Sequence, residues 1–266
     1  MNRDGVFYGL GAITLGLIGL AFGDFALQWQ PVPKDLPAHH LLALFSAASM
    51  LVLGLAVLWR RTARPAAAGL AVAYLGWVAL HGPATLAEPA SIASWLGVAE
   101  TLSLSVGGLA LFVMLVKEPS PRLRLAVRLL YGLCPLVFGL SHFAYADFTA
   151  SMVPGWIPNP LFWAYATGAG HLAAGLAILF GVIPRLAATL LATMMGCFVV
   201  MLHIPRVMAA PSSQLEWTMM AVAVSLTGAA WALRQSLPPP EPSGALAFDR
   251  IGLDSQHGGG DTRAAE

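Results

Sequence analysis

The sequence has very few charged residues. Only 10% of its 266 residues are Asp, Glu, Lys or Arg, whereas about a quarter of the residues in a soluble domain are charged. Hydrophobic residues make up 58% of the chain, and the mean hydropathy is +0.72. This composition excludes an ordinary soluble domain and predicts an integral membrane protein in contact with the lipid bilayer. The net charge of +1 is uninformative about nucleic acid, but no sizeable basic patch is present, so no nucleic-acid partner is predicted.

Cysteines and catalytic motifs are also scarce. The two cysteines, Cys134 and Cys197, both lie in apolar runs, which excludes a secreted disulfide framework and a CxxC redox pair. Their expected depths in the membrane differ, so we do not expect a disulfide between them. HExxH, P-loop, GxSxG and dinucleotide-binding motifs are missing. The sequence therefore indicates no enzyme class, and whether the protein is an enzyme stays open.

Long apolar runs fill most of the chain. A membrane-spanning helix needs about 20 mostly apolar residues, and a helix satisfies its own backbone groups in lipid. We therefore predict an all-α polytopic membrane protein with eight transmembrane helices. The predicted spans are 5–23, 39–59, 66–83, 93–116, 126–146, 160–181, 184–205 and 217–234.

The same landmarks occur twice along the chain. Tyr8-Gly9-Leu10 recurs as Tyr131-Gly132-Leu133, and Asp24-Phe25 recurs as Asp147-Phe148, both 123 positions later. A fixed offset between several landmarks is typical of a tandem duplication. We predict two four-helix repeats, residues 1–118 and 119–236. The first apolar run is then part of a repeat rather than a cleaved signal peptide.

Lys and Arg residues set the predicted orientation. With the N-terminus inside, ten of them are cytoplasmic and only Lys34 and Arg206 lie outside. We therefore predict a protein of the cell (inner) membrane with both termini in the cytoplasm. Four helices per repeat is an even number, so the two repeats are parallel. Residues 237–266 are rich in Pro and Gly and are predicted to be a disordered cytoplasmic tail.

Ionisable residues within the spans are rare, and they concentrate toward the predicted outer side. Such residues are expensive in lipid and mark candidate functional sites. The repeat keeps two of them, since Asp24 matches Asp147 and His81 matches His203. Solvation at helix ends and a turn-forming role for Asp are the alternative interpretations. The other members are His39, His40, Glu100, His142 and Glu216.

His171 differs from these residues because it lies about nine residues into its predicted helix, near the membrane midplane. Small residues surround it and would let another helix approach. It is either a neutral imidazole bonded to a neighbouring helix or a site residue. The histidines form no local metal-ligand motif, so no metal site is predicted. A haem would need two histidines at similar depth, and His203 paired with His142 or His81 fits that requirement only loosely.

The second half resembles the DoxX family of small four-helix membrane proteins. The resemblance covers about residues 125–210, and its strongest segments are Gly139-Leu-Ser-His-Phe143, Pro154-Gly-Trp156, Phe162-Trp-Ala-Tyr-Ala-Thr-Gly168 and His171-Leu-Ala-Ala-Gly175. The family often has an acidic residue in the helix that here carries His171. Some members resemble subunits of membrane oxidoreductases that pass electrons to quinones, and others accompany redox-stress systems. The resemblance implies a redox association and a membrane oxidoreductase subunit as partner.

These observations give three hypotheses for function. The first is a redox-associated membrane component that binds a quinone-like ligand near the outer leaflet, because quinone chemistry needs an apolar slot and a proton donor. The second is a non-enzymatic scaffold or assembly protein. The third, less favoured, is a small-solute transporter, for which the inner half of the bundle offers few polar partners. For the first hypothesis the predicted ligand-binding residues are His142, His171, His203, Asp147 and Trp156, while Trp29 is interpreted as part of an interfacial aromatic belt.

Overall fold

The fold of the described residues is entirely helical. The computed structural model describes residues 2–239, and within that range it contains no strand. The elements in chain order are η1 (Arg3–Gly5), α1 (Val6–Phe22), η2 (Leu27–Trp29), α2 (His39–Val57), α3 (Arg60–Leu80), α4 (Gly82–Ala87), α5 (Ile92–Leu115), α6 (Pro121–Ala144), α7 (Ala146–Met152), α8 (Pro160–Phe180), α9 (Pro184–Phe198), η3 (Val199–His203), α10 (Ile204–Ala209) and α11 (Gln214–Ser236).

Seven helices between residues 2 and 239 are long and apolar enough to cross a membrane. They coincide with the first seven predicted spans, so the all-α polytopic membrane fold is confirmed. The seven candidate spans are Arg3–Phe22, His39–Val57, Arg60–Ala87, Ile92–Leu115, Pro121–Ala144, Pro160–Phe180 and Pro184–Ala209.

The eighth predicted span, 217–234, corresponds to α11. This helix has 23 residues, which is about 34 Å and enough to span the bilayer, but it is less apolar than the seven candidate spans. It packs against α1, α5 and α9, and much of its surface is buried, including Thr218 and Ser225. A helix surrounded by other helices can carry small and polar residues that a lipid-facing helix cannot. The total of eight spans stays a prediction.

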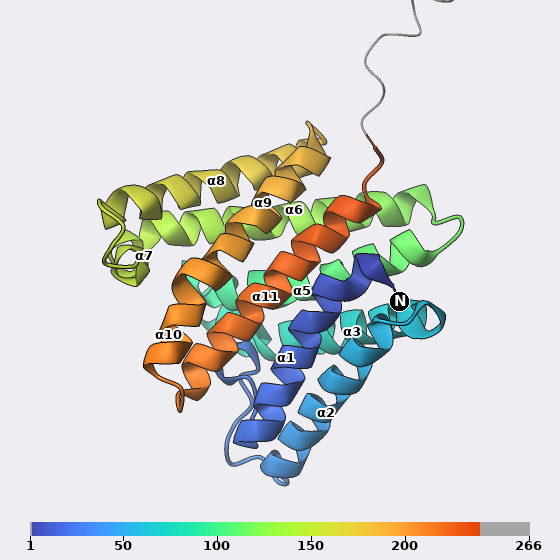
Figure 1. Cartoon of the computed structure of the whole chain (residues 1–266), viewed down its shortest axis with the longest axis horizontal. Helices are drawn as coiled ribbons and strands as arrows, with labels where there is room; N and C mark the ends of the chain where they lie inside the picture. Colours follow the sequence, from blue (N-terminus) through green and yellow to red (C-terminus); the bar gives the residue numbers. More distant parts are fainter. Residues whose placement is uncertain (1, 240–266) are drawn as a thin grey trace, which may run out of the picture.

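The long helices run back and forth between two ends of a bundle (Figure 1). At the terminal end, the first residues lie beside the last turn of α11, where Gln235 Nε2 donates a hydrogen bond to Asp4 Oδ1 at 3.3 Å. We call the opposite end the loop end; it contains segment 23–38, α4, α7 and α10. Helices α5 and α11 lie next to each other at the centre, with α1 against α11 and α6 against α5.

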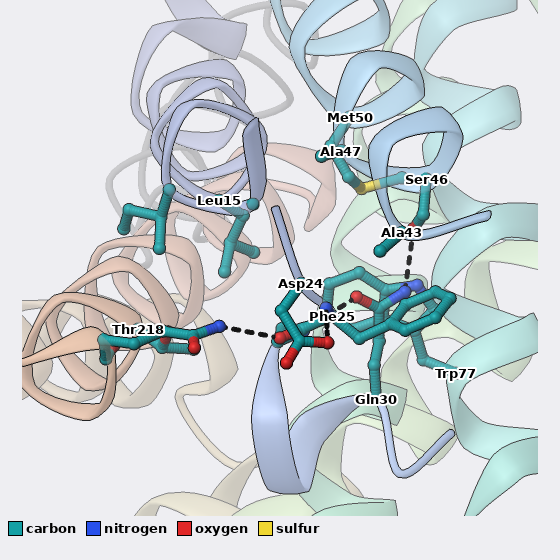
Figure 2. A pocket seen from close by; sticks show the side chains of 14 residues that line it. Leu15, Asp24, Phe25, Gln30, Ala43, Ser46, Ala47, Met50, Trp77 and Thr218 are labelled. Atoms are coloured by element: carbon teal, nitrogen blue, oxygen red, sulfur yellow. Dashed lines mark hydrogen bonds between the residues drawn. The ribbon is translucent and has the colours of Figure 1, made fainter. Parts of the chain in front are cut away.

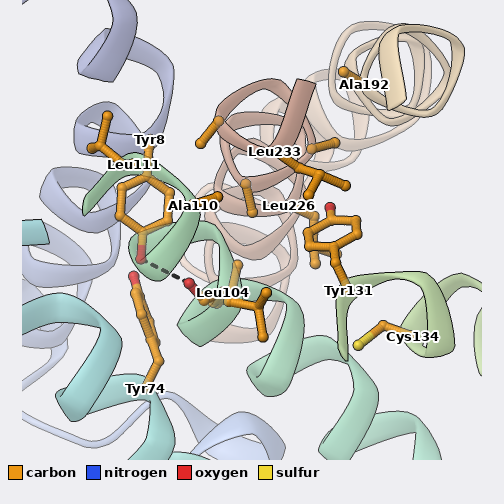
Figure 3. Close-up of a cluster of buried hydrophobic side chains, with 14 of the residues drawn as sticks. Tyr8, Tyr74, Leu104, Ala110, Leu111, Tyr131, Cys134, Ala192, Leu226 and Leu233 are labelled. Carbon is orange, nitrogen blue, oxygen red and sulfur yellow. Dashed lines mark hydrogen bonds between the residues drawn. The ribbon is translucent and has the colours of Figure 1, made fainter. Parts of the chain in front are cut away.

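The core between these central helices is built from tyrosines, leucines and small residues (Figure 3). Tyr8 and Tyr131 are each 1% exposed, and the Tyr8 hydroxyl donates to the Leu104 carbonyl oxygen at 2.7 Å. Small residues on α5 and α11 leave room for these rings, since a Cβ on Gly108 would lie 2.7 Å from the Tyr8 hydroxyl oxygen. Large apolar side chains such as Phe45 and Phe180 are exposed instead on the outside of the bundle, as expected for a surface that faces lipid.

The structure differs from the sequence prediction at several element boundaries. Helix α3 begins at Arg60 and α6 at Pro121, five or six residues before the predicted spans, because their first turns are helical but too rich in Arg to count as apolar. The tail was predicted to begin at 237, yet Leu237 is buried and its carbonyl oxygen accepts a hydrogen bond from Arg185 Nη1 at 3.2 Å. The prediction of disorder for residues 240–266 lies outside the described residues.

Candidate functional site

Two histidines from α6 and α8 lie side by side toward the loop end of the bundle. The ring centroids of His142 and His171 are 4.9 Å apart, and their planes are inclined by 37°. His171 is 1% exposed, whereas His142 is half-buried. Both were predicted as site residues, but the sequence did not predict that they pair with each other.

The pairing depends on the register between the two antiparallel helices. Gly139 of α6 lies against Leu172 of α8, and Gly132 lies against Leu179. By this register α6, which ends at Ala144, finishes beside about residue 167 of α8. The first two turns of α8 therefore extend past α6, where α7 packs against them. As a result, a histidine near the end of α6 meets one that is well inside α8.

Each imidazole is held by its own helix. His142 Nδ1 is 2.7 Å from the Phe138 carbonyl oxygen, and His171 Nδ1 is 2.8 Å from the Thr167 carbonyl oxygen. A carbonyl can only accept a hydrogen bond, so Nδ1 carries the proton in both rings. A neutral imidazole has one N–H group, which leaves each Nε2 as an acceptor with a free lone pair.

Aromatic side chains surround the inner imidazole. The Phe138 ring meets His171 edge-on at 5.7 Å, and the Phe198 ring stacks on it at 6.3 Å. Phe138 belongs to α6 and Phe198 to α9, so three helices fix the position of the ring. The surroundings of His171 are thus apolar apart from the His142 ring and the backbone carbonyl that it bonds.

The outer imidazole lies next to a more exposed pair of rings. Phe143 and Tyr165 are each 42% exposed, and their centroids are 5.5 Å apart. Phe143 follows His142 directly, and a Cβ placed on Gly168 would touch both His142 Cβ and the Phe143 ring. This face of α6 and α8 is therefore the side from which a molecule in the bilayer could reach His142.

His203, the third predicted histidine, lies in a different environment. It is 7% exposed and ends η3, a π-helical turn that leads into α10. Its buried Nδ1 has no hydrogen-bond partner among the described residues. Nearby, Arg206 and Glu216 form a bidentate ion pair with N–O distances of 2.8 and 2.7 Å. No hydrogen bond or ring contact in the described part of the chain joins His203 to the His142–His171 pair.

The two remaining predicted residues are on the surface of the loop end. Asp147 is an exposed residue of α7, and Trp156 is 70% exposed in the segment between α7 and α8. No hydrogen bond, ion pair or ring contact among residues 2–239 joins either of them to an imidazole of the pair. The structure thus brings together two of the five predicted site residues, His142 and His171, and leaves His203, Asp147 and Trp156 apart from them.

Sequence reasoning missed a buried contact in the first half. Trp29 was interpreted as an interfacial residue, but it is only 5% exposed, and its indole Nε1 donates to Glu100 Oε2 at 2.7 Å. The His81 ring packs against the same face of α5. A Cβ on Gly97, which is one turn before Glu100, would collide with that ring. The presence of Glu100 inside an apolar span was the only signal for this contact, because its partner is 71 residues away.

Residues 2–239 contain no cluster of metal-ligating side chains. Within that range no three His, Cys, Asp or Glu side chains gather closely enough to hold an ion. Cys134 is buried, Cys197 is exposed, and both are free thiols. The described site offers paired imidazoles among aromatic rings.

Comparison with known families gives a match to one family model. The model of the DoxX family matches residues 123–204, which contain both histidines of the pair. Comparisons with curated proteins and with solved structures give no match. The expected resemblance to the DoxX family is confirmed for residues 123–204 in the second half of the chain.

Proposed function

We propose that the protein is a redox-associated component of the cell membrane whose DoxX domain binds a quinone-like ligand at His142. The observation that carries this proposal is the His142–His171 pair, with ring centroids 4.9 Å apart and with both Nδ1 atoms bonded to backbone carbonyls. Two free Nε2 acceptors in apolar surroundings suit a ligand that is itself apolar and carries hydroxyl donors. The reduced, hydroquinone form of a quinone has these properties.

The two histidines have different roles in this proposal. His142 is half-buried and lies beside the exposed Phe143, so it accepts the hydrogen bond from the ligand hydroxyl. His171 is enclosed by Phe138 and Phe198 and supports the His142 ring from behind. Neutral histidine accepts protons in the physiological pH range, and a quinol must release protons when it is oxidised. Electrons would pass to a partner, a membrane oxidoreductase subunit.

We also propose that residues 1–118 and 119–236 are two copies of one unit. Several contacts support this interpretation. The Trp95 indole donates to the Pro89 carbonyl oxygen at 2.9 Å, and 122 positions later the Trp217 indole donates to that of Pro211 at 2.8 Å. In the proposed repeat, α1 corresponds to α6 and α5 to α11. The packing of α1 on α11 then corresponds to the packing of α6 on α5. In this arrangement each half supplies one of the two central helices.

The proposed orientation follows from the charges at the two ends. The terminal end contains the Arg-rich starts of α3 and α6, which favours the cytoplasmic side of an inner membrane. The loop end then faces outward, and the His142–His171 pair is nearer to the outer leaflet. A quinone-like ligand would approach His142 from the bilayer at that depth.

A binding measurement tests the proposed ligand. The full chain is purified in lipid nanodiscs and titrated with a short-chain ubiquinone, with tryptophan fluorescence as the readout. We expect His142→Leu to weaken binding at least about tenfold, because leucine has no acceptor and a hydrogen bond of roughly 1.5 kcal/mol is lost in apolar surroundings. His171→Gln should weaken binding less, through the position of the His142 ring.

His203→Leu is the matched control, since His203 is also a histidine of a long apolar helix but belongs to the α10–α11 corner. Unchanged binding in this variant supports the assignment to His142. Loss of binding in His203→Leu, with His142→Leu unaffected, would move the site to that corner. No quinone binding by the unmodified protein would overturn the proposal and favour the scaffold hypothesis.

A further inference from the structure

The segment between α1 and α2 is unusually long for a connection without a regular α-helix. It spans residues 23–38 and contains only the short turn η2, whereas most connections in compact folds have about 4–6 residues. Long irregular connections that are well ordered are usually functional. This segment is in the first half of the chain, away from the DoxX domain, so its chemistry is independent of the proposed quinone site.

Side-chain hydrogen bonds fix the segment to three helices. Gln30 Nε2 donates to Ser46 Oγ of α2 at 2.8 Å, and Gln214 Nε2 of α11 donates to the Phe25 carbonyl oxygen at 3.0 Å. The Trp29 indole bonds Glu100 of α5. The backbone of the segment is thus held in place before any ligand arrives, which lowers the entropic cost of binding.

The backbone is strained at two points of this segment. Leu27 has φ of 48° and Ala38 has φ of 59°, a left-handed conformation that residues other than glycine seldom adopt. Such strain costs about 1–3 kcal/mol per residue and persists only where the surroundings impose it. At these two positions, the fold therefore maintains a particular loop shape against local preference.

Segment 23–38, together with His39, lines an open cavity of about 290 Å³. Its apolar wall includes Phe25 and Leu27, and its polar lining includes Asp24, Gln28, Lys34 and His39. Cavities that hold small ligands usually have volumes of roughly 300 Å³ or more, so this one is suited to a small molecule. It opens at the loop end, where the side chains of Gln28 and Lys34 are exposed.

A smaller pocket, whose lining side chains are drawn in Figure 2, lies next to the cavity. Asp24, Phe25 and Gln30 line both spaces. The inner pocket has only about 10 Å³, which is room for one water molecule at most. It is bounded by Gly19 and Met50, which the repeat aligns with His142 and His171. The first half therefore lacks the imidazole pair and has a polar cavity above the corresponding position.

Charges of both signs face the outer cavity without neutralising each other. Asp24 Oδ1 accepts a hydrogen bond from the Phe25 backbone N–H at 2.7 Å and is 3.7 Å from His39 Nε2. This leaves Oδ2 without a protein hydrogen bond among the described residues. Lys34 takes part in neither ion pair found in residues 2–239. The cavity thus has one carboxylate oxygen and one cationic group available, together with an apolar wall.

We propose that this cavity is a binding site for a small zwitterion with an apolar side group, the chemical class of neutral amino acids. Asp24 would bind the ammonium group, Lys34 the carboxylate, and Phe25 with Leu27 the apolar group. Neither a simple amine nor a simple carboxylate would satisfy both charged residues. The site is on the loop end, so its ligand comes from water rather than from the bilayer.

The test is calorimetric titration of the full chain in nanodiscs with glycine, alanine, leucine and phenylalanine. The matched probes are isoamylamine and 4-methylpentanoate, which are leucine without its carboxylate and without its ammonium group. We expect at least one of the larger amino acids to bind with a millimolar or lower Kd. Each single-charge analogue should bind at least about tenfold more weakly.

Variants assign the binding to the cavity. Asp24→Asn keeps the acceptor for the Phe25 amide, and Lys34→Gln changes an exposed side chain, and each should weaken binding at least about tenfold. Asp35→Asn is the control, because Asp35 is exposed and next to Lys34 but does not line the cavity. If no amino acid binds, or if Asp24→Asn and Lys34→Gln bind as the unmodified chain does, the proposal is wrong. Should Asp24→Asn fail to fold, Lys34→Gln alone decides.

Discussion

Gly54 of α2 lies so close to Gly9 of α1 that a Cβ on Gly54 would be 2.9 Å from the Gly9 carbonyl oxygen. Gly175 of α8 has the same relationship to Gly132 of α6, also at 2.9 Å. In both helix pairs the two backbones touch where the sequence places a glycine on each side. Close approach through small residues is a main source of helix association in membranes.

We predict that Gly54→Ala and Gly175→Ala each destabilise the protein by about 1–3 kcal/mol, because backbone atoms cannot move aside as a flexible side chain can. The measurement is the melting temperature of the purified protein, followed by tryptophan fluorescence. Gly76→Ala is the control, since a Cβ there would meet nothing within 4 Å. An alanine is expected to be neutral or stabilising at that helical position. Equal melting temperatures for all three variants would contradict the prediction.

A second prediction concerns the buried contact between Trp29 and Glu100. Trp29→Phe keeps the aromatic bulk but removes the donor to Glu100 Oε2, and an unsatisfied buried polar group costs about 1–3 kcal/mol. Glu100→Gln keeps an acceptor for the indole and should cost less. Chemical denaturation of the two single variants and the double variant measures the coupling. Because the residues interact directly, the two effects should not add.

Trp95→Phe provides the comparison for that experiment. The Trp95 indole also donates a hydrogen bond, to the Pro89 carbonyl oxygen at 2.9 Å, but its side chain is 44% exposed, so water can replace the lost donor. We expect Trp95→Phe to be the milder of the two tryptophan variants. A larger effect at Trp95 than at Trp29 would show that the Glu100 contact is not important for stability.

The same contact illustrates what the sequence could and could not predict. The apolar runs predicted seven spans that the structure contains, because span length and composition are local properties. The partner of Glu100 could not be predicted, because Trp29 is in an irregular segment whose path depends on η2 and on hydrogen bonds to three helices. Trp29 instead fitted the general rule for interfacial tryptophans.

The candidate site was predicted in part, for a similar reason. His142 and His171 were both identified because ionisable residues are rare in apolar spans. Their pairing was missed because depth was counted from the predicted helix ends, which assumes that α6 and α8 start and stop together. Helix α8 instead extends about two turns past α6 and packs there against α7. The short helices α4, α7 and α10 were also missed, since each has only six or seven residues.

A third prediction concerns the ion pair at the start of α11. Arg206 Nε and Nη2 donate to the two carboxylate oxygens of Glu216 at 2.8 and 2.7 Å, and the Glu216 backbone N–H donates to Ser213 Oγ at 3.3 Å. Arg206→Lys keeps the charge but loses the fork-shaped geometry. With the arginine side chain 38% exposed, we expect a loss of only about 0.5–1 kcal/mol.

Salt distinguishes the electrostatic part of this contact from packing. Raising the salt concentration to about 1 M shortens the screening length to roughly 3 Å, so the stability difference between the unmodified chain and Arg206→Lys should shrink. The single variants Arg206→Gln and Glu216→Gln, together with the double variant, give the coupling energy. A difference that does not change with salt would mean that the guanidinium acts mainly through its packing.

The last prediction concerns orientation, because the charge distribution assigns opposite sides to the two ends of the bundle. We expect a cysteine at position 34 to be outside the cell membrane and one at position 61 to be inside. Lys34 is exposed in the segment between α1 and α2, and Arg61 is exposed in the first turn of α3. In a chain with Cys134 and Cys197 replaced by Ala, Lys34→Cys should react with a membrane-impermeant maleimide in intact cells. Arg61→Cys should react only after the membrane is permeabilised.

A second inside position, Arg122→Cys at the start of α6, serves as the control for the other half. If the two halves are parallel copies, positions 61 and 122 must respond alike. Labelling of position 122 alone in intact cells would mean that the halves insert in opposite orientations, and labelling of positions 61 and 122 but not 34 would invert the whole topology.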